Sequence, residues 1–332
     1  MDAIQTQQLL FNHIKAVLPL HLSFVDEIAD ALNISNDSAY RRIRGEKSIG
    51  LDELQILCSK YHISLDQLFH IQTNTVIFSY DKVEHNSFGF DKFLQFVAQS
   101  LGLFNTLPNP HMYFFSKDIP IFHFMPFPEL RAFKFFFWKR TIVGYPELAR
   151  QQFDGTESSA ENVEMAQKID QLYSKVPSTD IWNVESINVT LSQIELYRQS
   201  NIFAGKDVVR QVYAQLEELV NHLELMAELG KKFQYGRAVP PIDTRYDAYI
   251  NEALIGDNTI FVQSDTRQIT FINHIGLNFM STQNNDFCDY TYKNLQNIIR
   301  KSTHISVVGE KERRIFFNTL REKIHERQRN IG

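Results

Sequence analysis

The chain has 332 residues, of which 43% are hydrophobic, and its formal net charge is −5. This length favours two domains, and the apolar share excludes a disordered chain. The net negative charge excludes a protein that coats nucleic acid over its whole surface, so any contact with DNA has to come from a local patch.

Residues 1–72 predict an all-α domain of five short helices. Ser23, followed by Asp26, resembles a capping box that opens the second helix, and Ser35 is an N-cap candidate for the third. Gly45 is a natural residue to follow the end of that third helix. The fourth and fifth helices are expected within 51–69, so this part of the chain predicts a compact helical bundle.

Residues 73–332 predict a larger α+β region with antiparallel strands, with a sub-boundary possible near 236–243. We expect a strand at 75–83, a hairpin from the two strand-like runs of HMYFFSKDIPIFHFMPF, and three consecutive antiparallel strands at 243–255, 258–264 and 268–273. Helices are expected at 88–104, 128–142, 161–175, 206–233, 284–301 and 310–328.

The clearest functional pattern lies in the helix expected at 36–44. Ala39 and Ile43 are four residues apart and lie on one face, which can pack on the preceding helix. The opposite side then faces solvent, and only about three residues connect the two helices. This is helix-turn-helix geometry.

Basic residues gather at the end of this helix, although residues 1–72 are net acidic. Arg41, Arg42, Arg44 and Lys47 fall within seven positions. Arginine suits bidentate contact with guanine in the major groove, and polar residues at a helix N-terminus can donate to phosphate. The pattern predicts a local surface that faces nucleic acid.

The strings DEIADALNIS, NDSAYRRIRGEK, LDELQILCSKY and ISLDQLF together resemble λ-repressor-like, XRE-type helix-turn-helix transcriptional regulators. SAYRRIRGEK resembles the form found in regulators of the Bacteroidetes group. The family often has an acidic residue where this chain has Ile43.

The resemblance implies sequence-specific binding of double-stranded DNA by a homodimer, with 36–44 in the major groove. It implies DNA contacts from Asn36, Asp37, Ser38, Tyr40, Arg41, Arg42, Arg44 and Lys47. Two alternatives are a helix-turn-helix that binds protein and a basic helix end that is merely solvated.

A heptad-like pattern in the long helix at 206–233 predicts a second functional surface. The apolar residues follow 3-4-3-4-3 spacing, which is typical of a dimeric coiled coil. They are Val209, Val212, Leu216, Leu219, Leu223 and Met226. Further apolar residues widen this face, so a helix buried in the larger domain is an equal alternative.

Phenylalanine is unusually common, and 14 of the 27 Phe lie between positions 88 and 137. This density indicates an aromatic-lined pocket for a small apolar ligand, a subunit interface, or a plain dense core. The candidate residues are Phe122, Phe124, Phe127, Phe133, Phe136, Phe137 and Trp138.

No nucleotide-binding, hydrolase, metalloprotease or CxxC motif occurs, so we expect no enzymatic activity, cofactor or metal. A convergent polar cluster in a deep pocket would instead favour an uncharacterised enzyme in the C-terminal region. His111 and His123 flank the expected hairpin, where a structural role is favoured over a metal site. Cys288 is a weak candidate for a redox-sensing thiol.

The N-terminal sequence does not resemble a signal peptide and no 18-residue apolar span occurs, which predicts a cytoplasmic protein without a membrane span.

Overall fold

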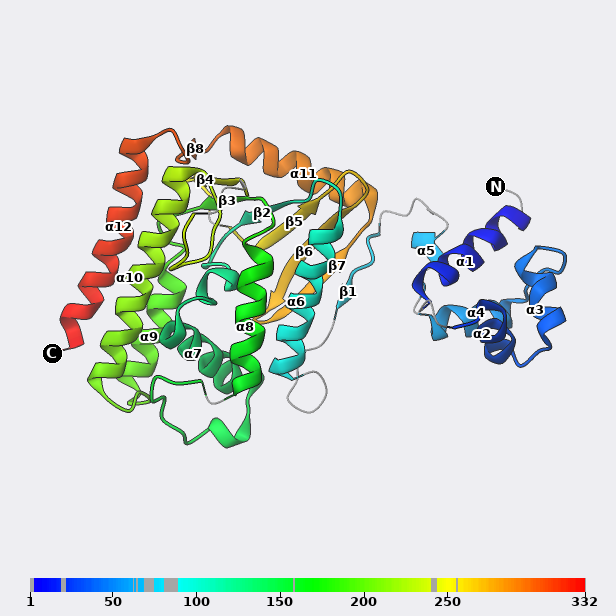
Figure 1. Ribbon diagram of the computed structural model, residues 1–332, viewed down its shortest axis with the longest axis horizontal. Helices are drawn as coiled ribbons and strands as arrows, with labels where there is room; N and C mark the ends of the chain where they lie inside the picture. Colours follow the sequence, from blue (N-terminus) through cyan, green and yellow to red (C-terminus); the bar gives the residue numbers. More distant parts are fainter. Residues whose placement is uncertain are drawn as a thin grey trace. The chain divides into compact units, whose positions relative to one another are not determined.

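A computed structural model describes residues 3–18, 22–61, 63, 65–68, 75–80, 89–157, 159–239, 244–254 and 256–331 (Figure 1). Contacts divide the chain into two compact units, Met1–Ile77 and Phe78–Gly332. We call them the N-terminal unit and the C-terminal unit. The boundary predicted after residue 72 and part of the sub-boundary predicted at 236–243 lie outside the described residues.

Within its described residues, the N-terminal unit contains only helices. They are α1 (Ala3–Val17), α2 (Phe24–Leu32), α3 (Asn36–Ile43), α4 (Leu51–Lys60) and α5 (Leu65–Leu68). Their apolar faces meet in a core that includes Leu10, Ile14, Ile28 and Leu57, which are completely buried. Burial of these faces, rather than helix propensity, holds such short helices in place.

Local capping signals set the limits of α3 but not the start of α2. Ser35 accepts a hydrogen bond from the backbone N–H of Ser38 at 3.3 Å, as predicted. Gly45, at φ +81°, has the left-handed conformation expected just after the helix. Ser23 does precede α2, but its side chain makes no capping hydrogen bond, so the capping box predicted there is wrong.

The C-terminal unit is built on a mixed sheet of eight strands in the described part of the chain, in the order β1-β7-β6-β5-β2-β3-β4-β8. The strands are β1 (Ser79–Tyr80), β2 (His111–Phe115), β3 (Ser178–Trp182), β4 (Tyr246–Ile250), β5 (Thr259–Gln263), β6 (Gln268–Ile275), β7 (Asn278–Thr282) and β8 (Thr303–His304). β2, β3 and β4 are parallel neighbours, whereas the other pairs are antiparallel. The unit is therefore α+β.

Helices cover both faces of this sheet. They are α6 (Phe90–Thr106), α7 (Pro128–Phe137), α8 (Ala160–Tyr173), α9 (Asn188–Gln199), α10 (Lys206–Leu229), α11 (Asn285–Arg300) and α12 (Glu310–Gln328), with short 3₁₀ turns η1 (Ile121–Phe124), η3 (Pro146–Leu148) and η4 (Arg329–Ile331), and the π-helix η2 (Trp138–Val143). α11 packs on one face through Cys288 and Leu295, which meet Ile181 and Phe261. The large core lies between the other face and the remaining helices (Figure 1). None of the described helices is both long and apolar enough to cross a membrane.

The hairpin predicted in HMYFFSKDIPIFHFMPF is wrong. Its first run is β2, but its second run is the 3₁₀ turn η1. β2 pairs instead with β3, where Met112 lies opposite Ser178, and with β5. Phe122, His123 and Phe124 are all buried in succession, so the second run lacks the alternation of a strand with one exposed face, and Pro120 cannot donate to a ladder.

Only part of the predicted three-strand meander exists. β5 and β6 form a hairpin as predicted, with Val262 opposite Ile269. β4 does not pair with β5 but lies between β3 and β8, and β7 was not predicted. The error arises because adjacency in sequence suggested hairpins, whereas β4 is the end of a parallel crossover from β3.

Of the two alternatives for the heptad-like pattern, the buried helix is confirmed and the coiled coil is wrong, because α10 is a core helix. Its six seam residues are at most 3% exposed and lie in the main core. α10 contacts α7, α12 and β4. Val209, Val212, Leu216, Leu219, Leu223 and Met226 are thus satisfied within one chain and are not free to form a dimer seam.

Candidate functional site

The exposed face of α3 is the first candidate site. Asn33 has the left-handed conformation, with φ +52°, and ends α2, so α3 begins only a few residues later. Ala39, completely buried, fixes one side of α3 against the core. The other side carries Tyr40, 48% exposed, and the side chains of Arg41 and Arg44, 56% and 67% exposed.

The structure leaves most of the other predicted DNA-contacting residues accessible. Asp37 and Lys47 are exposed, and Ser38 is half-buried. Asn36 is exposed too, and its amide donates to Asp26 Oδ1 at 2.8 Å. Residues of α3 and the turn after it therefore present donors, acceptors and cations to solvent.

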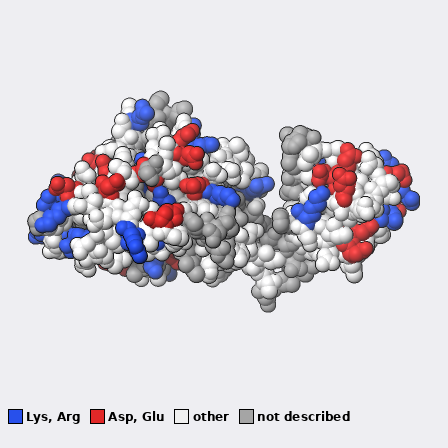
Figure 2. Space-filling model, turned by 90° about the horizontal axis from the view of Figure 1, so that it is seen from below, with Lys and Arg blue, Asp and Glu red and all other residues white. Residues whose placement is uncertain are grey.

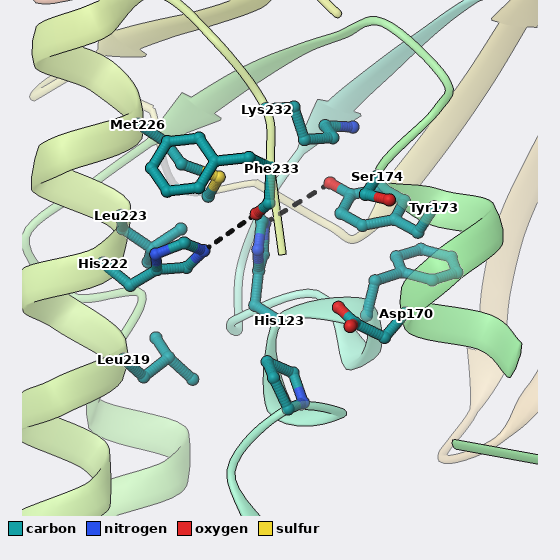
Figure 3. A pocket seen from close by; sticks show the side chains of 12 residues that line it. His123, Asp170, Tyr173, Ser174, Leu219, His222, Leu223, Met226, Lys232 and Phe233 are labelled. Carbon is teal, nitrogen blue, oxygen red and sulfur yellow. Dashed lines mark hydrogen bonds between the residues drawn. The ribbon is translucent and has the colours of Figure 1, made fainter. Parts of the chain in front are cut away.

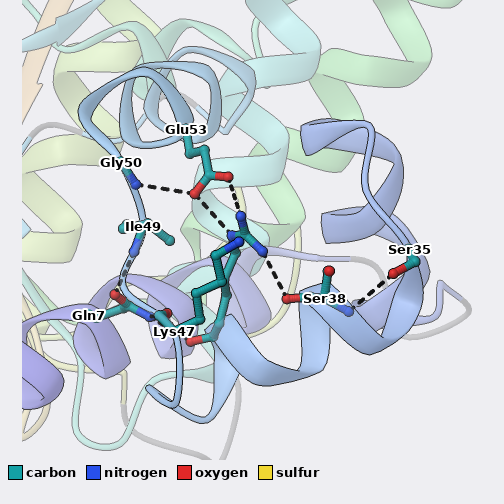
Figure 4. A network of polar contacts seen from close by, with 8 residues as sticks. Gln7, Ser35, Ser38, Lys47, Ile49, Gly50 and Glu53 are labelled. Carbon is teal, nitrogen blue, oxygen red and sulfur yellow. Dashed lines mark hydrogen bonds and ion pairs between the residues drawn. The ribbon is translucent and has the colours of Figure 1, made fainter.

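Arg42 is the exception, because it is buried and cannot belong to an exposed contact surface. Only 5% of this residue is accessible, and its Nη2 and Nε lie 2.6 and 3.0 Å from the two carboxylate oxygens of Glu53. A third bond runs from Nη1 to the carbonyl of Ser38 at 3.1 Å (Figure 4). The hydrogen bonds that Arg42 donates to the Glu53 carboxylate are the main cause that holds the pKa of Glu53 below its usual value. We correct the predicted contact set accordingly: Arg42 is part of the scaffold that orients α3.

Gln7 completes this scaffold, and it was not predicted. Its amide donates to the carbonyls of Arg42 at 2.7 Å and Lys47 at 2.9 Å, and its oxygen accepts from Ile49 N at 3.0 Å (Figure 4). Gln7 thereby connects α1 to the end of α3 and to the segment after it. The sequence could have indicated this role, because Gln7 lies one turn before buried Leu10 in α1, and a polar residue on a buried face needs hydrogen-bond partners.

The charge of this surface is mixed. Glu46 lies 4.0 Å from Arg41 Nε and 3.7 Å from Arg44 Nη1, in both cases with exposed side chains. Figure 2 shows basic side chains at the end of the N-terminal unit that holds α3, with acidic ones beside them. Such exposed pairs hold their partners weakly, so both arginines can exchange Glu46 for a phosphate or a base.

The second candidate is a buried polar cluster beneath the parallel strands of the C-terminal unit. Asp180 in β3 is inaccessible and accepts hydrogen bonds from Tyr246 Oη at 3.1 Å and Ser178 Oγ at 3.3 Å. His123 Nε2 lies 3.1 Å from the same carboxylate. Lys232 lies in the same core, where its ammonium donates to the Val176 carbonyl at 2.8 Å and sits 3.6 Å from the centre of the Tyr173 ring.

The environment of Lys232 disfavours the protonated form of its amino group. Burial lowers the pKa of this ammonium to about 7, although the negative charge of Asp180 works in the other direction. Nearby, burial also lowers the pKa of His222 to about 4, and its Nε2 lies 3.1 Å from the Phe233 carbonyl. The cluster is therefore a set of titratable groups in a largely apolar environment.

The cavity beside this cluster is too small for a substrate. His123, Tyr173, His222 and Lys232 line it (Figure 3), and it encloses about 20 Å³. That is about the space of one water molecule. The convergent polar groups that would favour an enzyme are present, but the deep pocket that they would serve is not found here.

The predicted aromatic candidates are core residues, and two of them also line a separate cavity. All seven are at most 9% exposed. Phe122 and Trp138 border a cavity of about 100 Å³ at the end of β2, whereas Phe124, Phe127, Phe133, Phe136 and Phe137 do not line it. For those five, the dense-core alternative holds.

The predicted histidine pair is not brought together. His111 bonds to Thr179 Oγ1 at 2.8 Å and lies against Tyr113 on the α11 side of the sheet, whereas His123 contacts Tyr173 in the main core. Among the described residues, no group of three or more His, Cys, Asp or Glu could hold a metal. Cys288 is completely buried, and burial raises the pKa of its thiol, so it lacks the features of a redox sensor.

Comparisons of the chain with protein-family models, curated proteins and solved structures find no match.

Proposed function

We propose that the protein is a transcriptional regulator that binds double-stranded DNA in a sequence-specific manner through α3. The observation that carries this proposal is the exposed face with Arg41 and Arg44, on a helix whose other side is fixed by buried Ala39 and Arg42. A rigid helix with outward arginines can enter the major groove, where each guanidinium can read guanine O6 and N7.

The two ends of α3 have different roles in this proposal. Asn36 and Ser38 lie in the first turn, where the helix N-terminus favours phosphate, so they position the helix on the backbone. Tyr40, Arg41 and Arg44 face the base edges, and Lys47 adds a phosphate contact. Two copies of the chain would read two half-sites about one helical turn apart. The C-terminal unit would then supply the dimer contact and the regulatory response, by shifting the spacing of the two α3 helices.

Selection of duplexes from a random pool tests this proposal directly. We expect the full chain to enrich one sequence, and Arg41→Ala combined with Arg44→Ala to weaken binding of that duplex at least about tenfold. We also expect a shallower dependence of the affinity on salt, because fewer counterions are released. The measurement is fluorescence anisotropy at several salt concentrations.

Lys15→Ala is the matched control, since Lys15 is an exposed cation of α1 in the same unit. It should leave binding nearly unchanged. Enrichment of no duplex, or equal affinities for the double variant and the control, would refute the proposal and favour a helix-turn-helix that binds protein.

A further inference from the structure

A polar cavity lies on the α11 face of the sheet, near the start of the parallel strands. Tyr113, Thr179 and Asp247 form one row across β2, β3 and β4, because Thr179 lies opposite both of the others. Phe261 of β5 continues this row and packs in the small core beneath α11. Beside that core, a cavity of about 360 Å³ remains between the sheet, α11 and the turn after β5. Small-molecule sites commonly measure about 300–1,000 Å³, so this cavity can hold a six-membered ring with its substituents.

Polar side chains form most of the cavity wall. The sheet contributes His111, Thr179, Arg245, Asp247 and Gln263, α11 contributes Gln296, and the rim consists of Asn109, Ser264 and Asp265. Among the described residues, the half-buried side-chain amides of Gln263 and Gln296 have no hydrogen-bond partner. Each amide can both donate and accept, so the wall offers a ligand hydrogen bonds of both kinds.

The charges around the cavity leave its interior without a net charge. Arg245 Nε lies 2.5 Å from Asp247 Oδ2, and His304 Nε2 lies 3.4 Å from the other carboxylate oxygen. Burial lowers the pKa of His111 to about 4, so its ring is neutral at pH 7. Asp265, the second carboxylate, is exposed at the rim. An anion would meet both carboxylates, and a cation would meet a guanidinium beside a carboxylate that is already neutralised. An uncharged ligand is therefore favoured.

The pair of Arg245 and Asp247 suits neighbouring hydroxyl groups. A guanidinium only donates and a carboxylate only accepts, whereas a hydroxyl does both. The Arg245 side chain is 70% exposed, and the Asp247 side chain keeps 10% of its surface exposed and lines the cavity. Two adjacent hydroxyls of one ligand can therefore accept from Arg245 and donate to Asp247 at the same time.

Aromatic rings supply the apolar part of the wall. Tyr113, Tyr249 and Tyr292 line the cavity. The ring centres of Tyr113 and Tyr292 lie 5.7 Å apart in an edge-to-face arrangement, and the His111 ring lies 4.6 Å from that of Tyr113. Such rings are apolar bodies with polar tips, against which C–H groups can pack. A sugar ring combines the two requirements of this wall, because it has C–H groups on its faces and hydroxyls at its edge.

We propose that this cavity binds a neutral sugar in its pyranose form. The hydroxyls bond to Asp247, Arg245 and the free amides of Gln263 and Gln296, and the C–H groups pack against the tyrosine rings. All residues involved belong to the C-terminal unit, so the proposal does not depend on binding of DNA.

Glucose, galactose and mannose are the probes, and the uronate and the amino sugar of each add one charge to the same ring. We expect saturation-transfer NMR on the full chain to detect at least one of the three hexoses at millimolar concentration. Its charged counterparts should bind at least about tenfold more weakly. Asp247→Asn keeps the shape of the side chain and should weaken binding of the hexose. It should also raise the affinity for the uronate relative to the hexose, because Arg245 is then no longer neutralised.

Substitutions of Gln296 test the location. Gln296→Ala should weaken the hexose about two- to tenfold, since one hydrogen bond to the ligand is lost and none within the protein. Gln296→Trp fills the cavity and should abolish binding. Asn297→Ala and Asn297→Trp are the matched controls, because Asn297 is the next amide of α11, is exposed and does not line the cavity. Both controls should bind like the wild type.

Three results would each overturn the proposal. One is that none of the three hexoses binds at millimolar concentration. Another is that a uronate or an amino sugar binds the wild type as tightly as its hexose. The third is that Gln296→Trp binds the hexose like Asn297→Trp.

Discussion

Replacement of Arg42 with alanine is expected to destabilise the N-terminal unit by about 3–5 kcal/mol, because it leaves the Glu53 carboxylate without its buried partner. Glu53 would retain only the backbone N–H of Gly50, at 3.1 Å, from its present partners. Marginal stabilities of small domains are of similar size, so a large share of the molecules should have this unit unfolded. The DNA binding proposed for α3 would then be lost without removal of any of its proposed groove contacts.

The two units can be followed separately in this experiment. Both tryptophans, Trp138 and Trp182, lie in the C-terminal unit, so their fluorescence in urea reports that unit alone. Hydrogen exchange of peptides from α2 to α4 reports the N-terminal unit. We expect Arg42→Ala to lose protection in these peptides while the fluorescence transition stays in place.

Two further variants separate the ion pair from general effects. Arg41→Ala, next to it but exposed, should change stability by less than about 0.5 kcal/mol. Arg42→Met with Glu53→Leu should recover most of the stability, since an apolar pair of similar volume needs no compensating charge. Equal protection in Arg42→Ala and Arg41→Ala would contradict the assigned role.

The same ion pair predicts a dependence on pH. Arg42 holds the pKa of Glu53 below its ordinary value of 4.5. The contribution of this ion pair to the stability of the N-terminal unit is therefore complete above the ordinary pKa of Glu53. It is lost as the pH falls through the lowered pKa of Glu53 in the folded protein.

The ends of a helix could be predicted from the sequence where capping signals are local, but the pairing of β-strands could not. Ser35 and Gly45 encode both ends of α3 in their own side-chain and backbone preferences, which requires no knowledge of the tertiary fold. The runs HMYFF and IFHF have similar composition, yet only the first is a strand. Its partner β3 begins more than 60 residues later, so the choice depends on contacts that short-range patterns do not contain.

In the candidate sites too, local sequence patterns predicted some features, whereas others depend on tertiary contacts. Periodicity correctly assigned Ala39 to the buried face of α3 and Arg41 and Arg44 to solvent, but it did not separate Arg42 from its basic neighbours. That distinction depends on Glu53 in another helix. For the buried cluster, Asp180 and Lys232 come from segments whose local sequences carry no motif, and only the packing of the C-terminal unit brings them together.

Lys232 gives the second large expected effect, because its folded pKa of about 7 lies well below the ordinary value of 10.5. Between these values the unfolded chain keeps the proton that the folded protein releases. Stability of the C-terminal unit should therefore rise with pH, by up to about 1.4 kcal/mol per unit from this residue. Below pH 7 both states are protonated, and the full cost of the buried charge remains.

Lys232→Met isolates this effect, since methionine fills similar space without a charge. Relative to this variant, the free energy of unfolding of the wild type should rise by about 4 kcal/mol between pH 7 and pH 10. The measurement is unfolding in urea, followed by tryptophan fluorescence. Loss of the bond to the Val176 carbonyl lowers the stability of the variant at every pH, so the slope rather than the absolute difference is diagnostic. Lys231→Met removes the same charge from a half-buried neighbour and should run parallel to the wild type. If the stability of Lys232→Met has the same dependence on pH as that of the wild type, the lowered pKa assigned to Lys232 is wrong.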